Sequence, residues 1–342
     1  MKKVLYIPLI LLGIPAILIT IANPGTQSID TFTYYFKFAI KPFSGFLLLF
    51  SAIYISIVTT YFVTKFVILI IDKTSPLTVK KEALTTIKNS FLKEVRESFS
   101  YGILIMLNFA FITILLSQLN ALNIHRLIDE IVLKWDFIIF GNYPFIALGN
   151  INYPSWIINS IIFSFDVIGG GLLILVAFLF YYNRHLFIEL ALTFFLSVVI
   201  MLPIWYVVPV LSPHDRFIDN VYDLPINDDL SKTLENYKPV PEISQYLTSI
   251  RATKEGKLNN VMPTSTFPSS HAAWAIFIMI YTYRLDRRIF YLSLPIAILS
   301  IFGTVILAQH YAVDVPMGIL IGILAIFTSR KVISCILGIC KI

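Results

Sequence analysis

The chain has 342 residues, of which 57% are hydrophobic and only 13% charged, and its formal net charge is +6. A mean hydropathy of +0.81 and recurring apolar runs of about twenty residues exclude a soluble globular protein and indicate a polytopic membrane protein. These runs contain Pro and Gly and do not alternate in polarity, so the predicted fold class is all-α and a β-barrel is excluded. Two cysteines, both near the C-terminus, give neither a disulfide framework nor metal-ligand spacing. The positive charge fits membrane orientation, so no nucleic-acid partner is expected.

About eight transmembrane helices are predicted from the apolar runs. In chain order they cover residues 4–22, 46–71, 101–122, 155–181, 186–210, 268–283, 289–308 and 312–329. The first run lacks a small-x-small cleavage pattern at its end, which favours an uncleaved anchor over a signal peptide. No fixed-period repeat is evident.

The polar segment 73–100 separates the second and third predicted spans. It is basic, and its apolar residues recur with helical spacing. Two interpretations remain open, an amphipathic helix lying on the membrane surface and one leg of a solvated helical hairpin. We therefore expect residues 1–100 to form an N-terminal extension with two spans and this basic cytoplasmic segment.

The distribution of Lys and Arg predicts the orientation of the chain. A cytoplasmic N-terminus puts most of the basic residues of short loops on the cytoplasmic side, in agreement with the positive-inside rule. They are Lys2, Lys3, Lys73, Lys80, Lys81, Lys88, Lys93, Arg96, Arg184, Arg284, Arg287, Arg288, Arg330, Lys331 and Lys341. Both termini are then cytoplasmic, and the long loop 211–267 is extracytoplasmic.

The sixth predicted span begins with an unusual polar group, "TFPSSHAAWA", residues 266–275. Pro268 suits the first turn of a helix, and Ser269, Ser270 and the free backbone N–H groups at the helix start can donate to phosphate oxygens. The two serines could equally be ordinary N-caps. His271 then lies at the extracytoplasmic end of this span.

A second polar group, "LAQHYAVDVPMG", precedes the eighth span. His310 and Asp314 are four residues apart, which is the spacing of a histidine and its orienting carboxylate on one helix face. Two histidines and an aspartate at helix starts on one side of the membrane suit phosphoryl transfer. A neutral imidazole can attack phosphorus, a carboxylate can hold its tautomer, and a second histidine can protonate the leaving oxygen. His310 with Asp314 is the predicted nucleophilic pair and His271 the predicted general acid and base.

"FPSSHAAWA" and "QHYAVDVPMG" resemble the second and third motifs of the type 2 phosphatidic acid phosphatase superfamily. Over residues 135–325, the resemblance implies a six-helix membrane core that acts on lipid phosphates through a phosphohistidine. The family's third motif usually has Ser-Arg where this chain has Gly303 and Thr304, and the family's first motif is not recognisable.

Both departures resemble the branch of inositol phosphorylceramide synthases and sphingomyelin synthases. Two further segments are similar to that branch. Residues 135–145, "WDFIIFGNYPF", resemble the Asp…Phe-Gly…Pro stretch ahead of its catalytic core, and residues 205–217, "WYVVPVLSPHDRF", occupy the place of its proline-rich exit from the following helix pair. Because the usual arginine is missing, Arg216 is the predicted phosphate-binding cation, although a loop salt bridge with Asp215 or Asp219 is an alternative. Lys238, Arg251, Lys254 and Lys257 are weaker candidates, and His214 is expected to be a solvated loop residue.

The sequence therefore predicts a catalytic core at 101–330, followed by a tail at 331–342. The expected enzyme is a lipid phosphotransferase that transfers a head group at the extracytoplasmic interface. Its partners would be a membrane lipid phosphate or phosphodiester and an acceptor, either a lipid alcohol or water, and no cofactor or metal is expected. The alternatives are a lipid phosphate phosphatase and, from another class, a transporter or channel. A transporter would more often carry polar residues near span centres and internal repeats.

Overall fold

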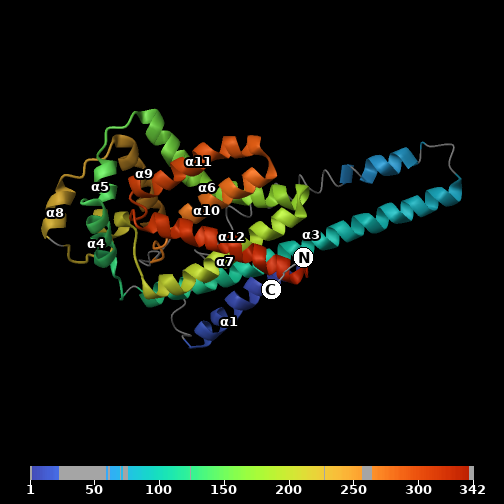
Figure 1. The fold of residues 1–342 in the computed structure, drawn as a ribbon, viewed down its shortest axis with the longest axis horizontal. Coiled ribbons are helices and arrows are strands. Elements are labelled where there is room, and N and C mark those ends of the chain that lie inside the picture. Colours follow the sequence, from blue (N-terminus) through green and yellow to red (C-terminus); the bar gives the residue numbers. More distant parts are fainter. Residues whose placement is uncertain are drawn as a thin grey trace.

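The computed structural model of the chain describes residues 2–22, 59–60, 62–69, 71, 76–123, 125–226, 228–255 and 264–338. Within these ranges all regular elements are helices, and the β structure consists of one isolated bridge between Val210 and Ser265. The long helices form a bundle that is drawn horizontally in Figure 1. This architecture confirms an all-α polytopic membrane protein.

Six of the described helices are long and apolar enough to cross a membrane. They are α1 (Tyr6–Ala22, preceded by the 3₁₀ turn η1, Lys2–Leu5), α3 (Leu77–Asn123), α6 (Ser155–Tyr182), α7 (Arg184–Val207), α11 (Arg287–Ile306) and α12 (Asp314–Ile336). A further bundle helix, α10 (Ser270–Leu285), has 16 residues and packs against α6, α11 and α12. These helices fall on seven of the predicted spans, and most of the remaining one, 46–71, lies outside the described residues.

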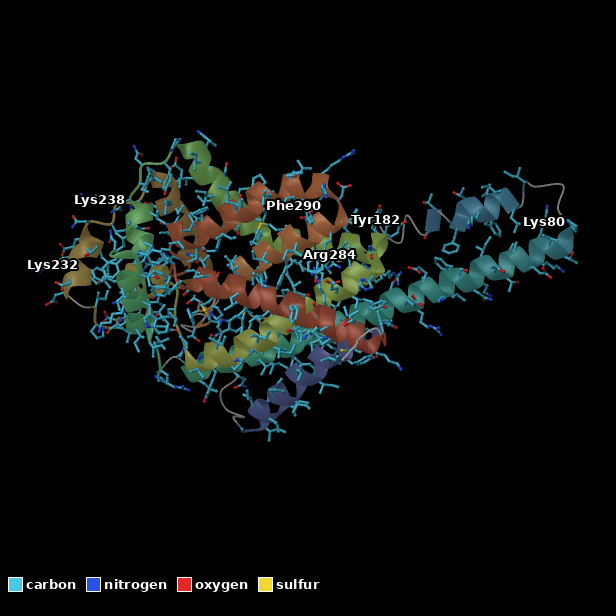
Figure 2. All side chains as sticks on the ribbon, viewed as in Figure 1. Lys80, Tyr182, Lys232, Lys238, Arg284 and Phe290 are labelled. Atoms are coloured by element: carbon cyan, nitrogen blue, oxygen red, sulfur yellow. The ribbon has the colours of Figure 1, made fainter. Side chains whose placement is uncertain are left out.

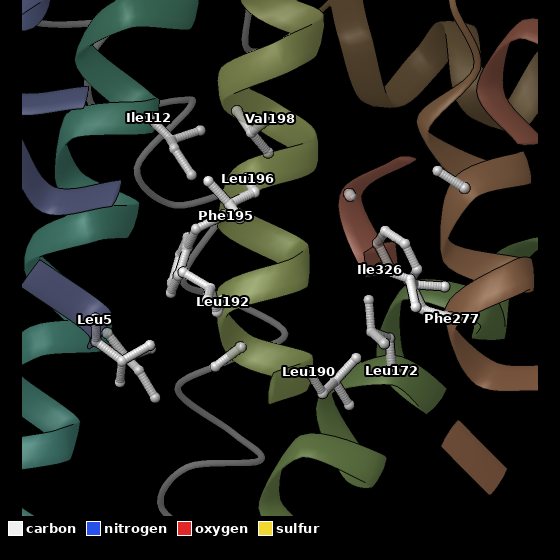
Figure 3. Close-up of a cluster of buried hydrophobic side chains, with 14 of the residues drawn as sticks. Leu5, Ile112, Leu172, Leu190, Leu192, Phe195, Leu196, Val198, Phe277 and Ile326 are labelled. Carbon is white, nitrogen blue, oxygen red and sulfur yellow. The ribbon is translucent and has the colours of Figure 1, made fainter. Parts of the chain in front are cut away.

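The helix α7 lies at the centre of the bundle. Its buried residues Leu192 and Phe195 belong to the same core cluster as Leu5 and Ile112 on one side and Phe277 and Ile326 on the other (Figure 3). The core therefore continues from the N-terminal helices into the helices that carry the two sequence motifs.

Short helices gather at one end of the bundle, on the left in Figure 1. They are α4 (Asp129–Phe140), α5 (Pro144–Gly149), the π-helical turn η2 (His214–Ile218), α8 (Asp228–Glu235) and α9 (Pro241–Glu255). The predicted loop 211–267 supplies η2, α8 and α9, so this loop is in large part folded onto the bundle. The α6–α7 and α10–α11 turns lie at the opposite end.

The helix α3 continues far beyond the bundle at that opposite end (Figure 1). Its 47 residues correspond to a length of about 70 Å, more than twice the hydrocarbon thickness of about 30 Å. Residues 77–100 thus prolong the axis of the spanning part and do not form a separate surface helix. Phe62 contacts Phe91 edge to face, with ring centroids 5.2 Å apart, which fits the alternative of a helical hairpin leg. Arg184 pairs with Glu94 and with Glu97 and so fixes this leg to the α6–α7 turn.

Candidate active site

The start of α10 is bonded directly to the start of α12. The Ser269 side chain caps α10 by accepting a hydrogen bond from the Ala272 N–H at 3.3 Å. The Ser269 N–H donates to the backbone oxygen of Asp314 at 3.1 Å. The two polar groups of the sequence, 43 residues apart from His271 to Asp314, therefore meet at one end of the bundle.

Two glycines of α12 permit this close approach. A Cβ atom at Gly318 would overlap the Ser269 carbonyl oxygen and would lie 3.0 Å from the carbonyl carbon and 3.1 Å from the Ala272 Cβ. One turn further along, a Cβ at Gly322 would lie 3.2 Å from the Ala273 Cα. Small residues four apart let membrane helices pack backbone to backbone. The glycine spacing of α12 thus sets the distance between the two histidine-bearing segments.

His310 lies in the turn between α11 and α12, and its Nδ1 faces two acceptors. The Asp314 Oδ2 is 3.1 Å from this nitrogen, and the Thr266 carbonyl oxygen is 3.0 Å from it. A carbonyl oxygen only accepts, so Nδ1 must carry the proton, and Nε2 keeps its lone pair. Burial, and to a smaller extent the neighbouring His271, lower the pKa of His310 to about 3, while the bond to Thr266 opposes the shift. The imidazole is therefore neutral at physiological pH.

His271 lies opposite His310, with ring centroids 5.7 Å apart. Its imidazole stacks on Phe165 of α6 at 4.4 Å and 10° and also contacts Trp274 at 5.0 Å. Its Nδ1 is buried and has no hydrogen-bond partner among the described residues. A buried donor or acceptor without a partner costs about 1–3 kcal/mol, and a bound ligand with complementary atoms would recover that energy.

Two buried carboxylates of α4 hold the turn that carries His310. Asp136 accepts the N–H groups of Ala312 at 3.0 Å and Val313 at 2.9 Å. Asp129 accepts the Leu211 N–H at 2.8 Å and the Tyr311 hydroxyl at 3.3 Å. Burial raises the pKa of Asp129 to about 6 and also raises that of Asp136.

Sequence reasoning did not assign a role to either carboxylate, although Asp136 stands in the quoted stretch 135–145. The available signal was an acidic residue inside an apolar helical segment, which is expensive unless it is bonded. Asp129 and Asp136 are positioning residues for the turn, because their contacts are with backbone groups and with Tyr311.

Arg216, the predicted phosphate cation, is buried in η2. Its guanidinium donates to the backbone oxygens of Leu224 and Pro225 at 3.4 and 2.9 Å, and Glu130 lies 3.8 Å away. No contact of this side chain with His271 or His310 is present in the described part of the chain. The guanidinium does act electrostatically on Asp129, whose pKa it lowers against the effect of burial.

The remaining residues that the sequence analysis named as possible phosphate contacts differ in burial and in their partners. The expectation that His214 is solvated is wrong, because this residue is buried, with its Nε2 3.2 Å from Asp219. Arg251 lies 3.6 Å from the same carboxylate, and Lys238 is exposed. The side chains of Lys254 and Lys257 lie outside the described residues. Ser270 is the first residue of α10 and is partly exposed, whereas Ser269 is buried and serves as the N-cap.

Within the described ranges no group of His, Cys, Asp and Glu has the arrangement of a metal site. The site thus offers a neutral imidazole with a free Nε2, a second histidine beside it and the N-terminus of α10. Groups of these kinds are the ones that general acid–base and nucleophilic chemistry at phosphorus uses.

Comparison with known protein families gave one match to this part of the chain. Residues 161–328 match the family model of the PAP2 superfamily. The matched segment contains α6, α7, α10, α11 and α12 and therefore both histidine motifs. The chain therefore has a PAP2-like membrane core, and the match supports an integral membrane enzyme of the phosphatase or phosphotransferase type. Comparisons with curated proteins and with solved structures gave no match.

Proposed function

We propose that the protein is a lipid head-group phosphotransferase that works through a phosphohistidine at His310. The observation that carries the proposal is the pair of acceptors at the His310 Nδ1, which leaves Nε2 as the nitrogen that can attack phosphorus. Asp314 would hold the tautomer and stabilise the positive charge that develops on the ring. The neighbouring His271, with its ring centroid 5.7 Å from that of His310, would exchange a proton with an oxygen bound to the same phosphorus.

The reaction divides into two displacements. In the first, His310 Nε2 forms a bond to phosphorus, the bond from phosphorus to the lipid oxygen breaks, and His271 gives a proton to that oxygen. In the second, His271 takes the proton of the acceptor hydroxyl, whose oxygen forms a bond to phosphorus while the bond to His310 breaks. His271 must hold a proton in one half-reaction and accept one in the other, and its imidazole lies between Phe165 and the site.

The phosphate would lie at the N-terminus of α10, where backbone N–H groups and the Ser270 hydroxyl can donate to its oxygens. The Ser269 oxygen is already used as the helix cap, so its contribution would be limited to its hydroxyl hydrogen. The unpartnered Nδ1 of His271 would gain a partner in the complex. These donors carry little fixed positive charge.

The scarcity of cations favours a phosphodiester donor. A phosphate monoester carries close to two negative charges, whereas a diester carries one, and fixed cations must balance them in a dry site. Thr304 stands where the family usually has arginine, and its hydroxyl donates to the Ile301 carbonyl oxygen. Arg216 has its hydrogen bonds with loop carbonyl oxygens. A diester therefore suits the site better than a monoester, as in the inositol phosphorylceramide and sphingomyelin synthase branch.

The second candidate is a lipid phosphate phosphatase, in which water replaces the lipid alcohol. The matched family includes phosphatases. Arg216 also lies close enough to Asp129 to lower its pKa, so a cation is present near the turn that carries His310. A phosphatase needs only a pocket open to water, whereas a transferase must exclude water and admit a second lipid.

One experiment distinguishes the two candidates. Purified protein is given a labelled diester phospholipid together with a lipid alcohol, and a parallel reaction contains a monoester lipid phosphate. The transferase is expected to move the head group to the alcohol, and His310→Gln in the same detergent should abolish the transfer. Release of inorganic phosphate from the monoester, with no transfer from the diester, would refute the transferase and support the phosphatase.

Sidedness and organisation follow from the same proposal. The histidine end carries the short helices α4, α5, α8 and α9. The basic residues Arg184, Arg284 and Arg330 lie near the helix ends at the other end of the bundle, which supports a cytoplasmic assignment for that end. The turn η1 contacts α12, so the described ends of the chain lie on one side of the bundle (Figure 1). Both termini would then be cytoplasmic, and the active site extracytoplasmic. Residues 1–100 would be an N-terminal extension to a catalytic core at 101–330, with a tail at 331–342.

A further inference from the structure

At the end of the bundle opposite to the histidines, one buried carboxylate binds two arginines. Glu189 of α7 is only 2% exposed, and Arg284 of α10 binds both of its oxygens, with the Nη2–Oε2 distance at 3.0 Å. The Nε of Arg330 on α12 lies 2.9 Å from Glu189 Oε1, and the Tyr281 hydroxyl donates to the same oxygen. His185 is the other titratable group nearby, 3.9 Å from Oε2. Two guanidinium groups against one carboxylate leave a net positive charge here.

Arg330 is only partly used by this pairing. Its Nε is bonded to Glu189, whereas its Nη1 and Nη2 have no hydrogen-bond partner among the described residues. Its side chain is 46% exposed, compared with 30% for Arg284. The carboxylate therefore fixes the position of the guanidinium and leaves the outer edge, with its fork of donors, available to an anion.

These arginines line a cavity of about 620 Å³ between α10, α11 and α12. The other lining residues are Met279, Ile280, Tyr283 and Phe290. Figure 2 shows Arg284 and Phe290 in this region of the bundle. The volume is in the range of small-molecule sites, and the lining combines apolar side chains with a few charged donors.

The cavity lining changes from apolar to charged along α10. Ile280 lies one helical turn deeper in the bundle than Arg284, a rise of about 6 Å. Tyr283 and Phe290 contact each other edge to face at 5.3 Å near the mouth, where aromatic residues mark the membrane–water interface. The apolar part is thus toward the hydrocarbon and the charged part toward water, which is the order of groups in a phospholipid. A free phosphate would leave the apolar part unfilled.

We propose that this cavity binds an anionic phospholipid of the leaflet opposite to the active site, with the lipid phosphate on Arg284 and Arg330 and an acyl chain along Met279 and Ile280. Basic pockets between membrane helices bind anionic head groups in this way. The site is separate from the two histidines, since it lies at the other ends of α10 and α12. The proposal does not depend on the reaction that the histidines perform.

The test is native mass spectrometry of the full-length protein with an equimolar mixture of phosphatidylglycerol and phosphatidylcholine that have identical acyl chains. The wild type is expected to retain phosphatidylglycerol over phosphatidylcholine by about fivefold or more, because one interfacial arginine contributes about that factor. Arg330→Gln should bring the ratio close to one. Arg288→Gln, an exposed arginine outside the cavity lining, is the matched control and should leave the ratio unchanged.

Ile280→Trp is a second variant. It keeps both arginines and fills the apolar part of the cavity with a larger side chain. It should lower phosphatidylglycerol retention about as much as Arg330→Gln, and gel filtration establishes that each variant is folded. Equal ratios for the wild type and Arg330→Gln, or an equal fall in Arg288→Gln, would overturn the proposal. Displacement of the lipid by millimolar glycerol phosphate would overturn it too, because it would identify a soluble phosphate compound as the occupant.

Discussion

Gly318→Ala is expected to reduce turnover strongly while leaving the fold intact. The added Cβ would overlap the Ser269 carbonyl oxygen and would lie 3.0 Å from the carbonyl carbon. Carbon atoms in contact prefer about 3.5–4.0 Å and the overlap with the carbonyl oxygen is more severe, so the starts of α10 and α12 must separate by at least roughly 0.5–1 Å. This shift moves His271 away from the His310–Asp314 pair. A misplacement of about 1 Å can lower the rate roughly 100-fold, and the overpacking should cost about 1–3 kcal/mol of stability.

The assay is the initial rate of head-group or phosphate release by purified protein, with the melting temperature measured in the same detergent. Gly170→Ala in α6 is the matched control, because a Cβ there meets nothing within 4 Å. Gly322→Ala should be intermediate, since its Cβ would lie 3.2 Å from the Ala273 Cα. Turnover of Gly318→Ala within about threefold of the wild type would show that helix spacing does not set the geometry of the site.

Three other outcomes are expected. His271→Gln should abolish turnover while keeping the melting temperature within a few degrees, and residual activity near the wild-type level would remove His271 from the mechanism. Asp136→Asn should lower kcat at least about 10-fold with little change in KM, because one of the two N–H groups of the turn loses its acceptor; an effect on KM alone would contradict a positioning role. The pKa of His310 is about 3 in the folded protein against an ordinary value of 6.5, so below pH 6.5 the unfolded chain binds a proton that the folded chain does not. His310 should therefore contribute about 2 kcal/mol to the loss of stability between pH 6.5 and 5, and a urea titration in which His310→Gln loses as much stability as the wild type would refute this origin.

Much of the fold followed from the sequence because membrane spans obey a simple physical rule. An apolar run of about twenty residues must become a helix, since its backbone has no other hydrogen-bond partners in lipid. The expected span 186–210 corresponds to α7, and 312–329 lies within α12. The continuity of α3 was missed because the polarity changes near residue 100 while the helix does not end there. Hydropathy reports the surroundings of a helix and carries no information about whether its backbone continues.

The site was predictable where the partners are close in sequence and unpredictable where they are distant. The spacing of His310 and Asp314 predicted their contact, which the structure contains at 3.1 Å. Thr266 and Asp136, by contrast, reach the same turn from other elements, through contacts that only the three-dimensional packing creates. For the same reason, the contacts of Arg216 with Leu224 and Pro225 could not be anticipated from its position after the fifth span.

The two acceptors at the His310 Nδ1 have a stereochemical consequence. Since that nitrogen holds its proton against Thr266 and Asp314, a phosphorus centre can be attacked only from Nε2, on the opposite edge of the ring. In the proposed route each in-line displacement inverts phosphorus, so two of them restore its original handedness. A donor made chiral at phosphorus with oxygen isotopes or sulfur should therefore yield a product of retained configuration. Direct attack by the acceptor would give the mirror-image arrangement, so the handedness of the product reports whether the histidine was ever covalently joined to the phosphate.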